Sequence, residues 1–117
     1  MIQILNNWEI KMAVIDVAYE TLKNYHLIKT KNDYSLRWLG MDISYYSTLK
    51  SKNRHASAKV YGRLAKKLMD QASVHRMSGE EPKAIEMSCL ASACINQIIF
   101  ANDNDGEVLS DKLHAHL

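Results

Sequence analysis

The 117-residue sequence has few of the residues that interrupt or crosslink a chain. One proline and four glycines leave long stretches in which helices can run unbroken. Two cysteines, Cys89 and Cys94, lie five apart in a helical pattern and point to different faces, so we expect free buried thiols and neither a disulfide framework nor a zinc pair. No apolar run approaches the roughly 18 residues that span a bilayer. No signal-peptide pattern stands out either, so we expect a cytoplasmic protein of one domain's size.

Charge is unevenly distributed behind a formal net charge of +2. Residues 29–76 carry eleven Lys and Arg against three Asp, whereas residues 1–28 and 77–117 are both net acidic. A basic middle between acidic flanks is typical of a surface that binds a polyanion. Lysines and arginines that only solvate helix faces would give the same counts, so charge alone assigns no function.

Apolar residues recur at three- and four-residue steps over five segments, which predicts five helices. Thr30, Asp42 and Ser57 each precede such a segment and are suited to cap it. Gly40 and Asn53 are suited to the left-handed conformation that ends a helix. The predicted helices cover about residues 7–25, 31–39, 43–50, 58–76 and 82–101.

Within residues 30–68, two of these helices are short and separated by Gly40, which permits a tight turn. Tyr34, Leu36 or Trp38, and Leu39 supply an apolar face for the first of them. This is the pattern of a helix-turn-helix unit, in which two short helices meet at a sharp angle.

The second helix of the unit has few apolar anchors. Leu49 is one, together with Ile43 or Tyr46, and we expect Tyr46 rather than its neighbour Tyr45 to point inward. Short polar residues that a buried helix would not favour lie between these anchors: Ser44, Ser47 and Thr48.

Several motifs in this stretch match a known family in order and with nearly its spacing. They are Thr30-x-x-Asp33-Tyr34-Ser35, Leu39-Gly40, Ser44-Tyr45-Tyr46-Ser47-x-Leu49, Lys50-Ser51-Lys52-Asn53-Arg54, Ser57, and Leu64-Ala65-Lys66-Lys67-Leu68. On these residues the segment resembles the lambda-repressor-like (Cro/C1, XRE-type) helix-turn-helix DNA-binding domains, and a group of short bacterial and phage proteins that carry such a segment. The sequence departs from the family at Trp38, which looks like an inserted residue, at Lys52 in place of Gly, and at Ala56 in place of Pro.

The resemblance implies how such a unit contacts duplex DNA. The second helix of the unit enters the major groove, where hydroxyl side chains contact base edges and Ile43 contacts a thymine methyl, unless Ile43 belongs to the core. The groups around the unit bind phosphates. The implied base contacts are Ile43, Ser44, Ser47 and Thr48, and the implied phosphate contacts are Thr30, Lys31, Arg37, Lys50, Lys52, Asn53, Arg54 and His55.

The predicted architecture is an all-α five-helix bundle that contains this unit and an additional C-terminal helix. We expect residues 1–76 to form the DNA-binding domain, with its unit at about 30–51, residues 77–82 to be a linker, and residues 83–117 to hold the last helix and a frayed tail. A wide apolar face on the last helix predicts either a homodimer or packing within the chain. The predicted dimer residues are Met87, Leu90, Ala91, Cys94, Ile95 and Ile98.

No phosphate-binding loop, zinc-protease motif or catalytic triad order stands out, and the five histidines are scattered. We therefore expect no enzyme, no metal site, no cofactor and no membrane association. The favoured function is sequence-specific binding of double-stranded DNA by a small transcriptional regulator, a repressor or autoregulator. The alternative is a helical protein–protein module, such as a phage-encoded inhibitor or adaptor, whose basic surface binds an acidic protein.

Overall fold

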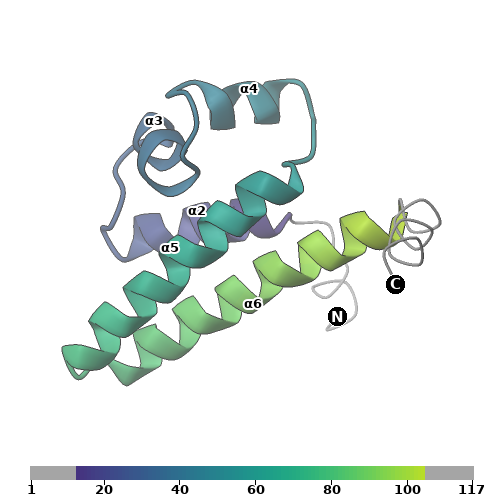
Figure 1. The fold of residues 1–117 in the computed structure, drawn as a ribbon. Coiled ribbons are helices and arrows are strands. Elements are labelled where there is room, and N and C mark those ends of the chain that lie inside the picture. The colour runs from purple at the N-terminus through teal and green to yellow at the C-terminus, as the bar shows by residue number, and fades with distance from the viewer. Residues whose placement is uncertain (1–12, 105–117) are drawn as a thin grey trace, which may run out of the picture. The chain divides into compact units, whose positions relative to one another are not determined.

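The computed structural model describes the backbone of residues 13–104 and the side chains of residues 13–99. The described chain is helical and contains no strand, which confirms the all-α fold class. The helices are α2 (Val14–Asn24), α3 (Lys31–Asp33) continued by the π-helical turn η1 (Tyr34–Trp38), α4 (Tyr45–Ser51), α5 (Ala58–Met77) and α6 (Glu81–Asn104) (Figure 1). With α3 and η1 taken as one helix, the described residues hold the five helices that the sequence predicts. The expected start of the first helix, at residue 7, lies outside the described range.

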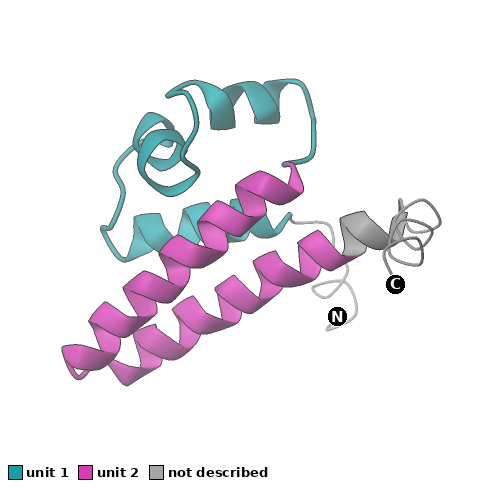
Figure 2. Ribbon diagram, viewed as in Figure 1, with its two compact units in different colours: residues 1–56 teal, residues 57–117 magenta. Residues whose placement is uncertain are grey.

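The chain divides into two compact units, Met1–Ala56 and Ser57–Leu117 (Figure 2). This division differs from the predicted linker at residues 77–82. In the structure those residues hold the end of α5 and the start of α6, so they close a helical hairpin rather than separate two domains. The helix-turn-helix segment and the long helices therefore belong to different units.

Three tyrosines form the centre of the first unit. The ring of Tyr19 on α2 lies 5.2 Å from that of Tyr34 and 5.1 Å from that of Tyr46, and the rings of Tyr34 and Tyr46 meet edge to face at 5.0 Å. Tilted and edge-to-face contacts at this distance are the favourable arrangements for aromatic pairs. The Tyr34 hydroxyl donates to the carbonyl of Ile15 at 2.7 Å. One cluster thus joins α2, η1 and α4.

Helix ends in both units close in the same way. Asn53 adopts a positive φ of 51° after α4, and the next residue, Arg54, donates its N–H to the carbonyl of Leu49 at 3.0 Å. Gly79 does the same after α5, where the Glu80 N–H donates to the His75 carbonyl at 2.8 Å. This pairing satisfies carbonyls that a helix end otherwise leaves unpaired. The left-handed roles expected of Gly40 and Asn53 are confirmed.

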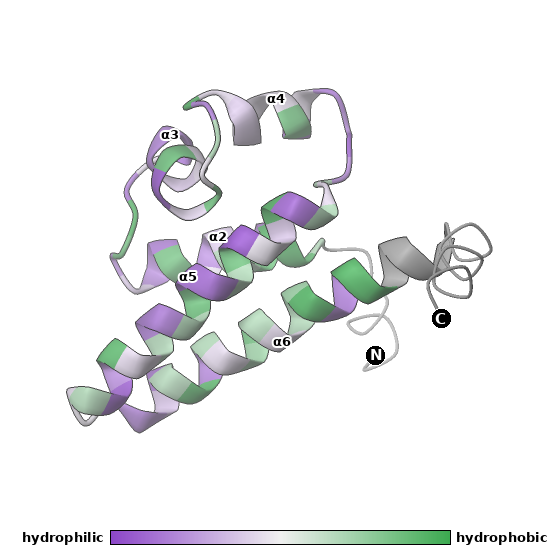
Figure 3. Ribbon diagram, viewed as in Figure 1, coloured by the Kyte–Doolittle hydropathy of each residue, from purple (hydrophilic) through white to green (hydrophobic). Residues whose placement is uncertain are grey.

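The second unit is the hairpin of α5 and α6, which pack against each other along their lengths (Figure 1). Ser57 caps α5 by accepting the Val60 N–H at 3.3 Å, as expected. Apolar residues recur at three- and four-residue steps along α5, with polar residues between them, which gives the helix one buried face (Figure 3). Its buried side chains are Val60, Tyr61, Leu64, Ala65, Leu68, Ala72 and His75.

Polar contacts hold the closed end of the hairpin. Lys83 donates to Glu80 at 2.8 Å, and the His75 ring lies 3.4 Å from the same carboxylate. The pKa of Glu80 is lowered mainly by the hydrogen bond from Lys83 and next by the hydrogen bond from His75. Among residues 13–104, none of the helices combines the length and the hydrophobicity that a membrane-spanning segment needs.

The two cysteines lie in different environments on α6. Cys94 is fully buried, and this burial raises the pKa of its thiol to about 12. Cys89 is exposed, so the expectation of two buried thiols is wrong for this residue. The five-residue spacing turns one side chain toward α5 and the other outward, because successive residues are about 100° apart around a helix.

We predict that a maleimide reagent labels the folded protein at one thiol only. Cys89 reacts rapidly, whereas Cys94 stays protonated and shielded and reacts at the rate of local unfolding. Timed mass spectrometry measures this, with Cys89→Ser as the control, in which rapid labelling disappears. Equal labelling rates for the two cysteines would contradict the packing of α6 described above.

Candidate nucleic-acid interface

The end of the first short helix contains Trp38, the residue that looks inserted by comparison with the family. Between Tyr34 and Trp38 the helix widens into a π turn, in which the Leu39 N–H donates to the Tyr34 carbonyl, five residues back, at 3.1 Å. A π turn absorbs one extra residue without breaking the helix. Trp38 and Leu39 are consequently buried, and Leu36 is 56% exposed. The structure thereby selects Trp38 over Leu36 as the apolar anchor.

Gly40 ends this helix in the left-handed region, with φ at 65°. The following residue, Met41, donates its N–H to the carbonyl of Ser35 at 3.0 Å. The Trp38 indole nitrogen is buried, and no described residue accepts a hydrogen bond from it. A buried N–H without a partner has an energetic cost. The Trp38 ring therefore stabilises the π turn through its apolar packing and not through a hydrogen bond of its N–H group.

Ser35 connects the two short helices. Its hydroxyl donates to the Lys31 carbonyl at 2.9 Å and accepts the backbone N–H of Tyr46 at 2.9 Å. Ser35 is fully buried, so its hydrogen bond with the Tyr46 N–H is shielded from water, whereas its hydrogen bond to the Lys31 carbonyl is partly buried. Since the N–H groups in the first turn of a helix have no partner within it, this hydroxyl takes the place of a cap for α4.

Tyr46 fixes the other side of α4. It is buried, as the sequence predicts, and its hydroxyl donates to a carboxylate oxygen of Asp16 on α2. Lys50, one turn further along α4, donates to the other oxygen of the same carboxylate at 2.8 Å. Burial raises the pKa of the Tyr46 phenol above its ordinary value of 10.0, and the Asp16 carboxylate raises it further. Asp16 therefore anchors α4 at two points.

The opposite face of α4 is open. Ser47 and Thr48 are exposed on the helix, and Ser44 and Ile43 are exposed in the turn before it. The helix begins at Tyr45, two residues later than expected, because Asp42 does not cap it. The Asp42 carboxylate instead accepts the Ser44 hydroxyl at 3.2 Å. Ile43 is 49% exposed, so the structure decides between its two predicted roles in favour of the surface.

The groups at the end of α4 form a cationic segment with no carboxylate partner among the described residues. Lys52, Arg54 and His55 are exposed there, together with Asn53. Within residues 13–104 none of the three basic side chains makes an ion pair. The charges of Lys52 and Arg54 are exposed to solvent, as a phosphate contact requires.

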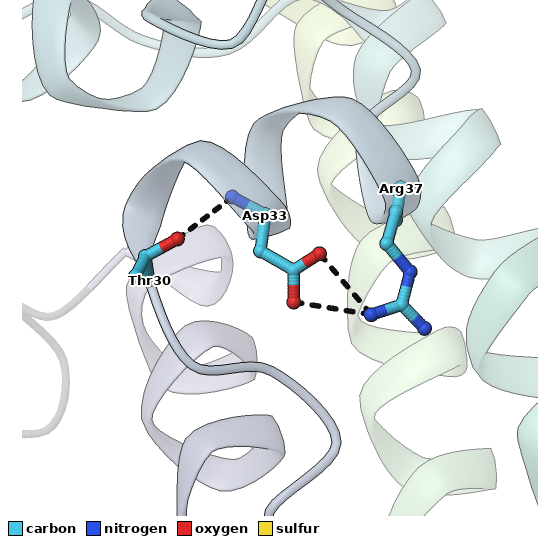
Figure 4. A network of polar contacts seen from close by, with 3 residues as sticks. All are labelled: Thr30, Asp33 and Arg37. Atoms are coloured by element: carbon cyan, nitrogen blue, oxygen red, sulfur yellow. Dashed lines mark hydrogen bonds and ion pairs between the residues drawn. The ribbon is translucent and has the colours of Figure 1, made fainter.

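Two other predicted phosphate ligands are already paired. Lys50 is bonded to Asp16, and Arg37 contacts both oxygens of Asp33 at 3.1 Å (Figure 4). Arg37 is more exposed than its partner carboxylate, so water screens this pair strongly. Both cations can contact a phosphate only by sharing or leaving a carboxylate.

Thr30 and Lys31 stand at the start of α3 and are exposed. Thr30 is the N-cap, as predicted, and its hydroxyl accepts the Asp33 N–H at 3.1 Å (Figure 4). The Asp33 carboxylate pairs with Arg37. That carboxylate lowers the local attraction for an anion at this helix start.

The predicted dimer residues require a correction. Met87, Leu90, Ala91 and Cys94 are buried within the single chain and therefore unavailable to a second copy in this structure. Packing within the chain, the alternative left open by the sequence, accounts for these four. Ile95 remains 44% exposed and Ile98 is half-buried. An apolar helix face looks the same in a sequence whether it meets a partner or its own neighbour.

Two positioning residues escaped the sequence reasoning, Asp16 and Ser35. Asp16 appears in the sequence as one acid among several in an acidic segment, and nothing there links it to Lys50, 34 residues later. Ser35 had a signal, since a serine between Tyr34 and the apolar residues that follow falls on the buried side of a short helix. No group of three metal-ligating side chains occurs in the described part of the chain.

We predict that Tyr46→Phe destabilises the first unit by about 2 kcal/mol, because Asp16 loses a charge-assisted hydrogen bond. Tyr19→Phe is the matched control: Tyr19 belongs to the same cluster, and its hydroxyl has no hydrogen bond among the described residues. Urea unfolding followed by tyrosine fluorescence measures both. Equal stability of the two variants would contradict the anchoring role of Tyr46.

The pH dependence of the same pair follows from the raised pKa. Because folding raises the pKa of Tyr46, its contribution is complete below pH 10 and is lost as the pH rises above that value. The free energy of unfolding should therefore fall more for the wild-type protein than for Tyr46→Phe when the pH is raised from about 9 to about 11. This range extends about one unit on each side of the pKa of an unfolded tyrosine.

Comparison with known families gives one match. A model described as "Family of unknown function (DUF6626)" covers residues 15–102, which is most of the chain and all of its described helical core. No curated protein and no solved structure shows significant similarity to the chain.

Proposed function

We propose that this chain, which belongs to the family of unknown function DUF6626, binds double-stranded DNA through α4. One observation carries the proposal: α4 is anchored from behind by buried side chains, and its opposite, hydroxyl-rich face is open and ends in unpaired cations. A helix that is fixed on one side and polar on the other is what a duplex reader inserts into a groove. The family description neither supports nor opposes this function.

The proposed base contacts are the side chains on and before the open face. Ser44, Ser47 and Thr48 can donate or accept hydrogen bonds at base edges, and Ile43 offers an apolar contact for a thymine methyl. None of the four is the Arg, Asn or Gln that forms bidentate contacts with a base. Each contact therefore discriminates between bases weakly, and we expect phosphate binding to provide most of the affinity.

The proposed phosphate contacts divide into two groups. Lys52, Asn53, Arg54 and His55 need no rearrangement, because no carboxylate in the described part of the chain pairs with them. Lys50 and Arg37 contact DNA by exchanging a carboxylate oxygen for a phosphate oxygen. Thr30 and Lys31 are placed at a helix start, where backbone N–H groups favour an anion, although Asp33 opposes it.

A protein with these properties would act as a small cytoplasmic transcriptional regulator, a repressor or autoregulator. A homodimer stays a prediction, and the face first assigned to it is largely used inside the chain. Sedimentation at tens of micromolar tests it, since a monomer under those conditions removes the need for paired half-sites.

A second candidate function is the binding of an acidic protein. Leu36 and Ile43 are large apolar side chains left exposed beside the cations of the first unit, and protein interfaces use such groups. Salt dependence separates the two functions. Phosphate binding releases condensed counterions from a duplex, which an isolated acidic protein surface lacks.

We predict that the affinity for a duplex falls steeply with salt, with a log–log slope near −5 for about six phosphates. Lys52→Gln with Arg54→Gln should make the slope shallower by about 2 and weaken binding about 50-fold at 0.1 M salt. Lys50 is left intact, because its removal would also disturb Asp16. Fluorescence anisotropy with a labelled duplex measures both quantities.

The control for that pair is Lys23→Gln with Arg76→Gln, which removes the same charge at positions outside the proposed contacts. If the two double variants bind equally well, the assignment of the phosphate contacts is wrong. If the wild-type protein has no salt-dependent affinity for any duplex, the proposed function itself fails.

We predict that Ser44→Ala and Thr48→Val change sequence preference more than affinity. Each contact is worth about 1 kcal/mol, so the ratio of affinities for preferred and altered duplexes should fall about fivefold. Ser73→Ala on α5 is the matched control, with an exposed hydroxyl outside the proposed interface. Competition between duplexes measures the ratio, and an unchanged ratio would remove α4 from base recognition.

A further inference from the structure

The exposed face of α5 is strongly cationic over its first half. Lys59, Arg63, Lys66 and Lys67 are all exposed there. At about 100° per residue, these four positions fall within an arc of about 100°. The centre of this arc lies opposite the apolar side of the helix, where Leu68 is fully buried. None of the four appears among the contacts proposed for the first unit.

One of these cations stands at a locally unfavourable position. Lys59 lies in the first turn of α5, which contains no acid and where the helix dipole disfavours a cation. Lys66 lies 3.9 Å from Asp70, and both side chains are largely exposed, so water screens that pair.

Solvation of the second unit does not require these charges. The whole of α6, Glu81–Asn104, contains one cation, Lys83, although many of its positions are exposed. The cations are therefore concentrated on one face of one helix, against local cost, which is expected when an external anion stabilises them.

We propose that this face of α5 is a second phosphate-binding surface that contacts the backbone of duplex DNA. The inference rests on the proposed function and adds to it a contribution from the second unit. Charge complementarity favours DNA over a protein partner: the face is rich in lysine, which protein interfaces exclude and DNA interfaces favour, and it presents no aromatic side chain. Because lysine contacts phosphate without reading sequence, the surface contributes affinity and not preference.

The test compares two triple variants in the full chain. Lys59→Gln, Lys66→Gln and Lys67→Gln remove three charges from this face and leave Arg63 in place. Lys23→Gln, Arg76→Gln and Lys83→Gln remove three charges elsewhere. Anisotropy with a labelled 20-base-pair duplex measures affinity over a salt series, and thermal unfolding by circular dichroism confirms that both variants fold.

The expected result is a slope shallower by about 2 to 3 and an affinity about 100-fold lower at 0.1 M salt for the α5 variant, to the same degree for every duplex sequence. If both triple variants retain equal affinity and slope, this inference fails while the proposed function stands. If the wild-type protein binds no duplex, both fail together. Polyglutamate that competes as well as the duplex at equal charge concentration would overturn the choice of partner.

Discussion

The orientation of α4 depends on one buried side chain, Tyr46, which is held at three places. Its backbone N–H is bonded to the Ser35 hydroxyl, its ring packs against Tyr19 and Tyr34, and its own hydroxyl is bonded to Asp16. These contacts come from two other elements of the first unit: Asp16 and Tyr19 belong to α2, and Tyr34 and Ser35 belong to η1. A helix of seven residues is too short to be stable alone, so tertiary contacts of this kind must supply its stability. They also decide which face of α4 stays open.

Carboxylates in the first unit serve structure and at the same time moderate its positive charge. Asp16 orients α4 but takes up the charge of Lys50, and Asp33 pairs with Arg37. Lys52 and Arg54, which follow α4, make no ion pair among the described residues, and the same holds for Lys29 and Lys31 at the start of α3. The first unit therefore keeps exposed, unpaired cations near both short helices.

Much of the fold is readable from local chemistry. Thr30 and Ser57 cap helices as their side chains suggest, Gly40 and Asn53 adopt the left-handed conformation, and Tyr46 points inward. The caps and the left-handed turns depend on neighbours within a few residues, whereas the inward direction of Tyr46 follows from helical periodicity. The all-α class follows for the same reason, because helical periodicity is a short-range property.

The parts that escaped prediction depend on long-range contacts or on competition between close alternatives. The π turn needs the burial of Trp38 to stabilise it, and the late start of α4 reflects the preference of Asp42 for the Ser44 hydroxyl. His26 takes a left-handed conformation, with φ at 60°, and the Leu27 N–H can then reach the Leu22 carbonyl at 2.9 Å. The apolar face of α6 predicts either a dimer or packing within the chain, because a sequence does not say which surface an apolar stripe meets; Met87, Leu90, Ala91 and Cys94 prove to be buried within the chain.

The central claim, that the open face of α4 reads duplex DNA, is tested most directly by selecting bound sequences from a random duplex pool with the full chain. The account predicts enrichment of a short motif with modest preference at each position, and an altered motif when Ser44 and Thr48 are replaced together. Recovery of the starting pool without any enriched motif, from wild-type protein that is folded by circular dichroism, would contradict it.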